Sequence, residues 1–209
     1  MPLEREFKFR LSASELARLK RAGRVCELSR QINYYFDVFP ELPFSRHRIG
    51  IRIRNQNGNY FLTIKFPAQG NRQKRGFHVQ EEWESALSRE SAQKVIRGKT
   101  TLTSLRARPI QILKKNGAKL PLKNIHRVGS MKNVRYRLEY PGPLFLELDH
   151  FTIGKKHFYE AECETSRPKS DLKAIRALWR TTKIPLRAEG RSKLARFLLV
   201  LRVKHELKK

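Results

Sequence analysis

The sequence predicts a mainly antiparallel α+β fold of about eight strands, consistent with a closed barrel that has helices packed outside. Three observations lead to this class. Segments in which polar and apolar residues alternate recur along the chain, as in half-buried strands. Most of them are joined by short turns or single helices, and Asn57-Gly58 is a strong two-residue hairpin signal. The length of 209 residues, without an internal repeat or a clear linker, fits one domain.

The first elements follow from alternation and capping. Leu3–Arg10 alternates between apolar and charged residues, which predicts a strand with one face in the core. Ser12 and Glu15 form a capping box that opens a helix ending near Gly23. Alternation and a high content of Tyr, Phe and Ile then predict strands at Gln31–Val38, His47–Asn55 and Tyr60–Phe66.

The middle of the chain has weaker signals. Pro67–Gly76 is a basic loop, and Phe77–Ser85 is strand-like. Ser88–Arg97 has the pattern of a short capped helix, which we expect to continue with breaks to Arg106. Further strands are expected at Pro109–Lys115, Ile125–Val128 and Lys132–Tyr140.

The last third of the chain predicts a hairpin and two helices. Leu144–Ile153 and Lys156–Thr165 are strands that meet around Gly154. Pro168 begins a helix with apolar residues at helical spacing, and Ser192–Glu206 is the last helix. We expect Ser192 to cap that helix rather than to act as a nucleophile.

The net charge is far from zero. The chain has 46 Lys and Arg against 19 Asp and Glu, a formal charge of +27. Its 12 Phe, 6 Tyr and 2 Trp exclude a disordered basic tail. Self-repulsion of this size predicts a polyanionic partner, such as nucleic acid, polyphosphate or an acidic membrane surface. The denser basic clusters are Arg72–Arg75, Arg187–Arg196 and Lys204–Lys209.

The cysteines and the apolar pattern bear on the compartment. Cys26 and Cys163 are too few for a disulfide framework, so we expect two small buried residues in a reducing compartment. No run approaches the roughly 18 apolar residues of a transmembrane helix, and the N-terminal residues do not resemble a targeting peptide. An intracellular location, in cytoplasm or an organelle matrix, is therefore expected.

Several predicted strands carry charge on one face only, and on any single strand contact with water explains this most simply. Taken together, the strands favour another explanation. Glu160, Glu162 and Glu164 place three carboxylates on one face, about 6–7 Å apart. Like charges so close repel unless a cation lies between them, and hard divalent cations such as Mg²⁺ bind carboxylate oxygens. The same spacing occurs at Glu4 and Glu6, and at Glu82 and Glu84.

Paired cations on other strands suit the opposite task. Guanidinium groups form forked hydrogen bonds with phosphate oxygens, and ammonium groups add point charges. The pairs are Arg52/Arg54 and Arg135/Arg137, and the single lysines Lys8 and Lys65 join them.

These residues match a known family. Glu4-x-Glu6-x-Lys8 resembles the signature of the CYTH, or triphosphate tunnel metalloenzyme, superfamily. One such motif is common by chance, whereas eight further matches in the family's order are specific. They are Gln31–Asp37, Ile51–Arg54, Leu62–Lys65, Glu82-x-Glu84, Arg135-x-Arg137, Leu146–Asp149, Tyr159–Glu164 and Ser192-Lys193.

The resemblance implies one domain over residues 1–209, an eight-stranded antiparallel closed barrel whose lumen is a charged tunnel. Members of the family bind a triphosphate along this tunnel with Mg²⁺ or Mn²⁺. They include inorganic tripolyphosphatases, thiamine triphosphatases, class IV adenylyl cyclases and fungal-type RNA triphosphatases.

The resemblance also implies roles for single residues. Metal would be bound by Glu4, Glu6, Glu162 and Glu164. Glu82 and Glu84 would help to bind metal or to position the attacking water. Phosphate oxygens would be held by Lys8, Arg52, Arg54, Lys65, Arg135, Arg137 and Lys193, with Lys8 and Lys193 contacting the transferred or leaving phosphate. Glu147, Asp149 and Glu160 would be further lumen carboxylates without a firm role.

This assignment leaves the excess charge unexplained. The proposed lumen set has nine acids and seven bases, so the remainder of the chain has 10 acids and 39 bases, a net charge of +29. A second polyanion, RNA or polyphosphate, is therefore expected on the exterior.

Three functions compete. The first is a metal-dependent triphosphatase acting on tripolyphosphate or a small organic triphosphate, with an RNA triphosphatase as a subcase. The second is an RNA-associated structural protein, in a ribosome-like assembly, that reuses the tunnel fold. The third is a class IV-type adenylyl cyclase, for which no nucleobase pocket can be identified in the sequence.

Overall fold

A computed structural model describes residues 3–68, 76–117, 119–142 and 144–206, with side chains to residue 201. Among these residues the strands are β1 (Leu3–Leu11), β2 (Arg24–Asp37), β3 (Gly50–Gln56), β4 (Asn59–Pro67), β5 (Phe77–Leu87), β6 (His126–Tyr140), β7 (Leu144–Ile153) and β8 (Lys156–Glu164). The α-helices are α1 (Ala13–Ala22), α2 (Pro43–Arg46), α3 (Arg89–Ile96), α4 (Arg108–Asn116), α5 (Pro168–Thr181) and α6 (Lys193–Glu206). Two 3₁₀ turns are η1 (Leu102–Ser104) and η2 (Leu122–Asn124).

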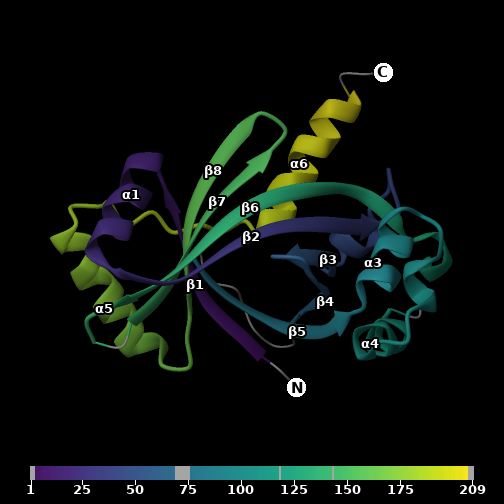
Figure 1. The fold of residues 1–209 in the computed structure, drawn as a ribbon, viewed down its shortest axis with the longest axis horizontal. Helices are drawn as coiled ribbons and strands as arrows, with labels where there is room; N and C mark the ends of the chain where they lie inside the picture. Colours follow the sequence, from purple (N-terminus) through teal and green to yellow (C-terminus); the bar gives the residue numbers. More distant parts are fainter. Residues whose placement is uncertain (1–2, 69–75, 118, 143, 207–209) are drawn as a thin grey trace.

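The strands form the closed antiparallel barrel that the sequence predicts. Neighbours pair in the order β1–β5–β4–β3–β2–β6–β7–β8, and β8 returns to pair with β1 (Figure 1). The long strands β2 and β6 pair along almost their whole length and arch over the barrel. Closure leaves no unpaired sheet edge, and period two sends alternate side chains into the lumen.

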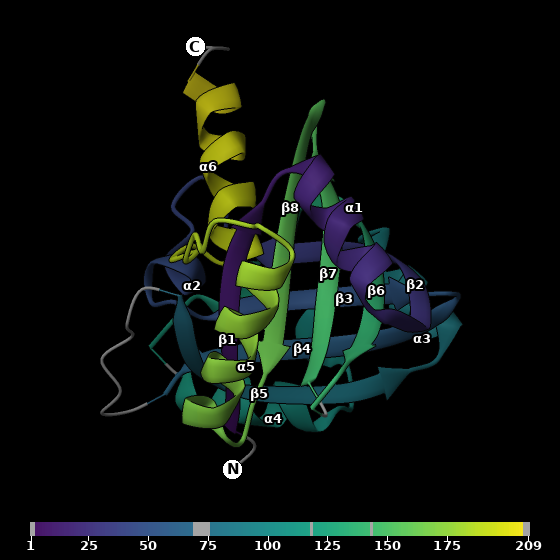
Figure 2. The same ribbon diagram turned by 90° about the vertical axis from the view of Figure 1, so that its left-hand side faces the viewer.

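The outward-facing apolar residues pack under the helices in three clusters. One lies beneath α3 and α4, where Leu62 and Ile64 of the barrel meet Leu113. A second lies beneath α1 and α5 and includes Leu146 and Trp179. The third joins the base of α6 to strands β2, β6, β7 and β8. Figure 1 shows α3 and α4 at one end of the molecule and α1 and α5 at the other, and α6 projects from the barrel in both Figures 1 and 2.

The capping and hairpin signals are confirmed. Ser12 accepts a hydrogen bond from the backbone N–H of Glu15, whose side chain accepts one from the backbone of Ser12. Asn57 and Gly58 have positive φ angles of 51° and 92°, as the β3–β4 turn requires.

One predicted strand is wrong. Pro109–Lys115 lies in the helix α4, because Pro109 suits the first helical turn and cannot donate to a sheet. Ile110 and Leu113, three residues apart, share the buried face of this helix.

Another prediction divided one strand in two. Ile125–Val128 and Lys132–Tyr140 belong largely to the single strand β6, with Gly129 between them. A Cβ atom added to Gly129 would come within 2.6 Å of the Phe197 ring, so this glycine marks a close approach of α6 and not a break.

Three element boundaries also differ. β2 begins at Arg24, earlier than predicted. The sequence carries no signal for this part of the strand, because residues 24–28 are all exposed and do not alternate between polar and apolar side chains. β3 begins only at Gly50, since α2 and the left-handed residue Arg48 (φ 60°) precede it. The helix after Ser88 ends at Ile96, where Gly98 takes a positive φ of 71°, and does not continue to Arg106.

The cysteine prediction is half right, because Cys163 is buried but Cys26 is exposed. The basic cluster Arg72–Arg75 lies outside the described residues, as do the side chains of Lys204–Lys209. None of the described helices is both long enough and apolar enough to cross a membrane.

The packing of the second cluster yields a stability prediction. Leu146 on β7 is fully buried, so we expect Leu146→Ala to lower the free energy of unfolding by about 2–5 kcal/mol. Leu28→Ala on β2 is the control, since Leu28 is 44% exposed and its truncation should change the value by no more than about 0.5 kcal/mol. Urea denaturation measures both, and equal losses would contradict the assignment of Leu146 to the core.

Candidate active site

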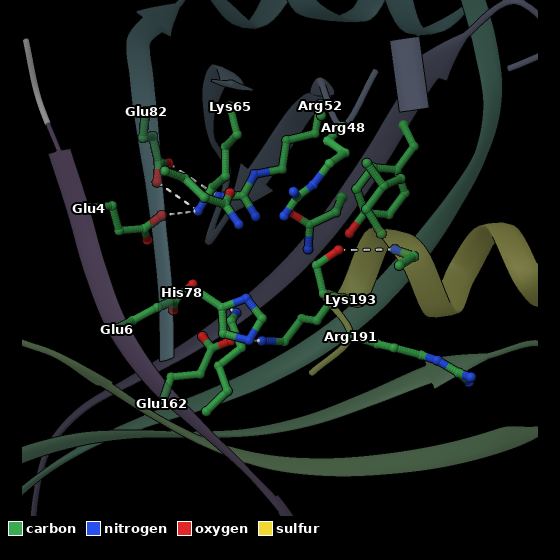
Figure 3. A pocket seen from close by; sticks show the side chains of 18 of the residues that line it. Glu4, Glu6, Arg48, Arg52, Lys65, His78, Glu82, Glu162, Arg191 and Lys193 are labelled. Atoms are coloured by element: carbon green, nitrogen blue, oxygen red, sulfur yellow. Dashed lines mark hydrogen bonds and ion pairs between the residues drawn. The ribbon is translucent and has the colours of Figure 1, made fainter. Parts of the chain in front are cut away.

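The barrel encloses a cavity of about 640 Å³ lined mainly by charged side chains. They come from β1, β3, β4, β5, β6, β7 and β8, and from the start of α6 (Figure 3). Alternation along each strand explains this convergence, because every second side chain faces the lumen. The apolar residues between them face the helices outside.

Glu162 of β8 is the centre of one half of the cavity. Its carboxylate accepts hydrogen bonds from Lys8 (2.5 Å), Lys193 (2.6 Å) and Arg135 (2.7 Å). Burial alone would raise the pKa of Glu162, but Lys193, Lys8 and Arg135 lower it well below its ordinary value. Register explains the first contact, because Lys8 lies directly opposite Glu162 across the β1–β8 pair.

Asp149 and Glu160 are fully buried and do not line the cavity, so they are not the lumen carboxylates that were predicted. Asp149 binds the guanidinium of Arg135 at 2.7 and 2.8 Å, and Lys193 contacts Asp149 at 2.8 Å and Glu160 at 3.1 Å. Burial would lower the pKa of Lys193, but Asp149, Glu162 and Glu160 raise it. The ammonium therefore stays charged at the mouth of the tunnel.

Lys65 of β4 is the centre of the other half. It contacts Glu4 at 2.5 Å and Glu82 at 2.7 Å, as Figure 3 shows. Arg52 lies 3.6 Å from Glu82. Burial would raise the pKa of Glu82, but Lys65 and Arg52 lower it, so this carboxylate is ionised.

Glu84 lies on β5 two residues after Glu82. It accepts hydrogen bonds from Arg54 at 2.9 Å and from the Thr63 hydroxyl at 2.7 Å. Burial and the nearby charge of Arg52 lower the pKa of Arg54. Burial would lower the pKa of Arg52 as well, but the carboxylates Glu82 and Glu84 raise it. The shortage of negative charge is therefore confined to Arg54, where an added anion is favoured.

The α6 N-terminus brings Lys193 to the cavity. The Ser192 hydroxyl accepts a hydrogen bond from the backbone N–H of Ala195 at 3.1 Å, so Ser192 caps the helix as the sequence predicts. Arg196, one turn further on, contacts Glu160 at 3.0 Å and also pairs with Glu189. These buried contacts fix α6 against β8.

A group of carboxylates near Glu164 has the chemistry of a hard-cation site. Burial raises the pKa of Glu164, and the charges of Glu4, Glu6 and Glu82 raise it further. Glu164 has no ion pair within 4 Å among the described residues. A divalent cation bound by oxygen ligands would relieve this repulsion. In the part of the chain that the structure describes, no three His, Cys, Asp or Glu side chains lie together as a ready-made cation site, and Glu4 and Glu6 are paired with Lys65 and Lys8.

The cavity also has unused hydrogen-bonding groups. The Nε atoms of Arg52 and Arg54 are buried and have no acceptor among the described residues, and Asn33 Oδ1 has no donor. Two buried guanidinium N–H groups without an acceptor, on residues that line the cavity, are typical of a site for anionic oxygens.

The structure brings together twelve of the thirteen residues that the sequence predicts for the site, and all twelve line the large cavity. Arg137 is the exception. It lines an adjoining cavity of about 170 Å³, which shares Arg54, Arg135 and Glu147 with the large one, and its guanidinium lies 5.3 Å from the centre of the Phe145 ring.

Several cavity residues were not predicted. Gln31, Asn33 and Asn133 line it with their amides, and Gln31 and Asn33 have the same period-two spacing that identified the charged residues. Arg48 and Arg191 line it from loops, where no periodicity reveals the direction of a side chain. His78 lies inside as well, with Nε2 2.9 Å from the carbonyl oxygen of Glu189.

Comparisons with known proteins agree with this geometry. The family profile of the CYTH domain matches residues 2–198. HpAC1 from Hippeastrum, described as an adenylyl cyclase candidate with a dominant triphosphatase activity, superposes with a TM-score of 0.82. It is 27% identical, and the match covers 93% of this chain and 94% of that one.

More distant structures share the fold. An adenylate cyclase candidate from Bacillus halodurans is 19% identical, with a TM-score of 0.72 over 94% of this chain and 99% of that one. A protein from Pyrococcus horikoshii is 20% identical, with a TM-score of 0.55 over 90% and 96% of the two chains. No curated protein sequence matches the chain.

The contacts of Glu162 predict a pH dependence. Its pKa is lowered in the folded state, so it stabilises the fold above its unfolded pKa of about 4.3, and this contribution is lost as the pH falls through the folded-state value. Glu162→Gln should therefore reduce the loss of unfolding free energy between about pH 5 and about pH 2.

Urea denaturation across this range measures the effect. Glu90→Gln is the control, because its partner Lys94 is exposed and such pairs contribute little. An acid dependence that is the same in all three proteins would contradict the role given to Glu162.

Proposed function

Because this chain belongs to the CYTH domain family, we propose that it is a divalent-metal-dependent triphosphatase. Its substrate is inorganic tripolyphosphate or a small organic triphosphate bound in the barrel lumen. The reaction is the hydrolysis of a phosphoanhydride bond.

One observation carries this proposal. Six cations line one cavity of the barrel, and each is ion-paired with a carboxylate that lines it too; they are Lys8, Arg52, Arg54, Lys65, Arg135 and Lys193. A triphosphate carries several anionic oxygens in a row and can replace carboxylates as their partner. The free Nε–H groups of Arg52 and Arg54 support this, since phosphate oxygens would satisfy them.

The carboxylates fit a metal by their chemistry. Glu4, Glu6 and Glu164 would hold Mg²⁺ or Mn²⁺, and Glu162 would join them once phosphate oxygens take over its cations. Such an ion, when bound, neutralises phosphate charge and makes a nearby water easier to deprotonate.

The side chains then divide the work of in-line displacement. Arg52, Arg54, Lys65 and Arg135 hold the phosphates in a fixed orientation. A water held by Glu82 and Glu84 attacks the terminal phosphorus, and its proton passes to a carboxylate. The bond from that phosphorus to the bridging oxygen breaks, and Lys8 and Lys193 neutralise the charge on the transferred and leaving groups. Positioning and charge supply most of the catalysis in such reactions.

A triphosphatase is favoured over a cyclase by two observations. The similar structure of HpAC1 is described by its dominant triphosphatase activity. Tyr35 and His78 are the only aromatic rings among the described residues that line either cavity, and Tyr35 is buried against Phe197. His78 is also buried, so no aromatic ring of the described lumen is exposed as a platform for a nucleobase.

The exterior favours a second function, association with RNA or another polyanion. Outside the lumen set the chain carries a net charge of +29, which the tunnel chemistry does not use. This function is compatible with catalysis, and it would stand alone if the tunnel were inactive.

The catalytic proposal predicts phosphate release from tripolyphosphate with Mg²⁺ or Mn²⁺. Lys8→Ala and Glu4→Ala should each lower kcat by about 100-fold or more, because each removes a charge that contacts the substrate or the metal. Arg5→Ala is the matched control, since Arg5 lies on the exposed outer face of the same strand.

The outcome distinguishes the three functions. Protein that releases no phosphate from tripolyphosphate, thiamine triphosphate or ATP with either metal would contradict catalysis and leave the association with RNA. Cyclic AMP as the main product from ATP would identify a cyclase.

The metal ligands predict a separate effect on stability. Added Mg²⁺ or Mn²⁺ should raise the Tm of the metal-free protein by about 2–4 °C or more, because it binds the folded state. Glu164→Gln should abolish this shift, whereas Glu90→Gln, outside the barrel, should retain it. An equal shift in both variants would contradict Glu164 as a ligand.

A further inference from the structure

A large share of the unexplained charge, +9 of the +29, lies in one continuous segment beside the barrel. Residues 88–125, here called the helical cap, contain α3, η1, α4 and η2. They carry ten Lys and Arg and a single acid, Glu90. The ten bases are all exposed, and they are Arg89, Lys94, Arg97, Lys99, Arg106, Arg108, Lys114, Lys115, Lys119 and Lys123.

Nothing within the described protein neutralises this surface. Its one ion pair joins Lys94 to Glu90 at 2.7 Å. Arg108 lies over the ring of Trp83, 5.1 Å from its centre. None of the ten bases lines either cavity, so the tunnel site does not account for them.

The helical cap is attached to the barrel by its apolar side. Ala92, Val95 and Ile96 of α3 and Ile110 and Leu113 of α4 belong to the core cluster beneath it. The opposite side mixes the bases with exposed hydroxyl and amide groups, namely Thr101, Ser104, Gln111, Asn116 and Asn124. Lys, Arg and such neutral donors are the groups that contact the sugar–phosphate backbone in nucleic-acid complexes.

The same surface lacks what other partners need. No large hydrophobic residue of the helical cap is exposed among those described, so a membrane or an apolar protein interface has no anchor there. The absence of an exposed aromatic ring from these described residues also removes the stacking platform that single strands require. Of the partners considered, the one that this surface fits is the phosphate backbone of a nucleic-acid duplex.

The shape of the helical cap distinguishes between duplexes. α4 has nine residues and lies against β4 and β5, and unlike α6 it does not project from the barrel as a helix that reads the major groove of B-form DNA would (Figure 1). The minor groove of A-form RNA is wide and shallow, and a flat surface can reach its phosphates and 2′-hydroxyls. We propose that the helical cap binds double-stranded RNA through the phosphate backbone.

This proposal rests on the proposed association with RNA and adds where on the protein the RNA binds. The test compares two triple variants that remove equal charge from opposite ends of the molecule. Arg108→Gln/Lys114→Gln/Lys115→Gln alters α4, and Lys169→Gln/Lys173→Gln/Arg176→Gln alters exposed positions of α5. Each removes one Arg and two Lys, so the net charge of the two proteins is the same.

Binding of an RNA duplex of about 20 base pairs is measured over a series of salt concentrations, on protein stripped of nucleic acid. The α4 variant should bind at least about tenfold more weakly, with a salt slope lower by about 3, while the α5 variant keeps the affinity of the unaltered protein. Equal Tm values of the three proteins confirm that they are folded. Phosphate release from tripolyphosphate should be the same in all three.

Three outcomes would overturn the proposal. Equal weakening in both variants would mean that RNA affinity depends only on the net charge of the protein. The association with RNA would then stand, but its assignment to the helical cap would not. Equal affinity for a DNA duplex of the same length would contradict recognition of the A-form. Binding to vesicles of anionic lipid but not to RNA would show that the partner is a membrane surface and not RNA. Loss of catalysis alone would affect the tunnel proposal and not this one.

Discussion

The fold depends on the neutralisation of charges that β-strand alternation forces into a closed space. Lys8 is the clearest case, because it is buried in the lumen and would be costly there without an anion. Its register partner across the β1–β8 pair is Glu162, which also receives Lys193 and Arg135. The ion pairs therefore join distant parts of the chain, and their removal one partner at a time would leave uncompensated charge inside the barrel.

The same constraint explains why the interior suits exchange with a ligand. Buried ion pairs recover their desolvation cost only in part, so a substrate that supplies more anionic oxygens in the right positions can compete for the cations. Arg52 and Arg54 illustrate this, since each has an ion-pair partner and still has an unused Nε–H group. The repulsion around Glu164 is the corresponding feature on the anionic side, where a cation is favoured. Stability without ligand and the proposed binding of a phosphate chain and a metal thus depend on one set of charges.

The charges on the exterior differ from those in the lumen. Its charges are exposed and screened by solvent, so they cost the fold little and are free to select a partner. The helical cap combines a buried apolar face with an outer face that lacks counter-ions apart from Glu90. The molecule therefore has two separate electrostatic systems, a nearly balanced one inside the barrel and a strongly unbalanced one outside.

Period-two patterns in the sequence predicted most of the barrel and the lumen-facing direction of eleven of the twelve predicted residues that line the large cavity, because alternation decides which side chains share a face. Lys193, at the start of α6, was predicted only from the family resemblance. Alternation could not determine what depends on contacts between distant segments. The helix α4 and the continuity of β6 through Gly129 were decided by packing against the barrel and against Phe197. Arg48 and Arg191 reach the large cavity from loops, and Arg137 lies in the smaller cavity next to it, although Arg135 on the same face lines both. Local alternation fixes the direction of a side chain, whereas only barrel closure fixes how far along the tunnel it lies and which charges surround it.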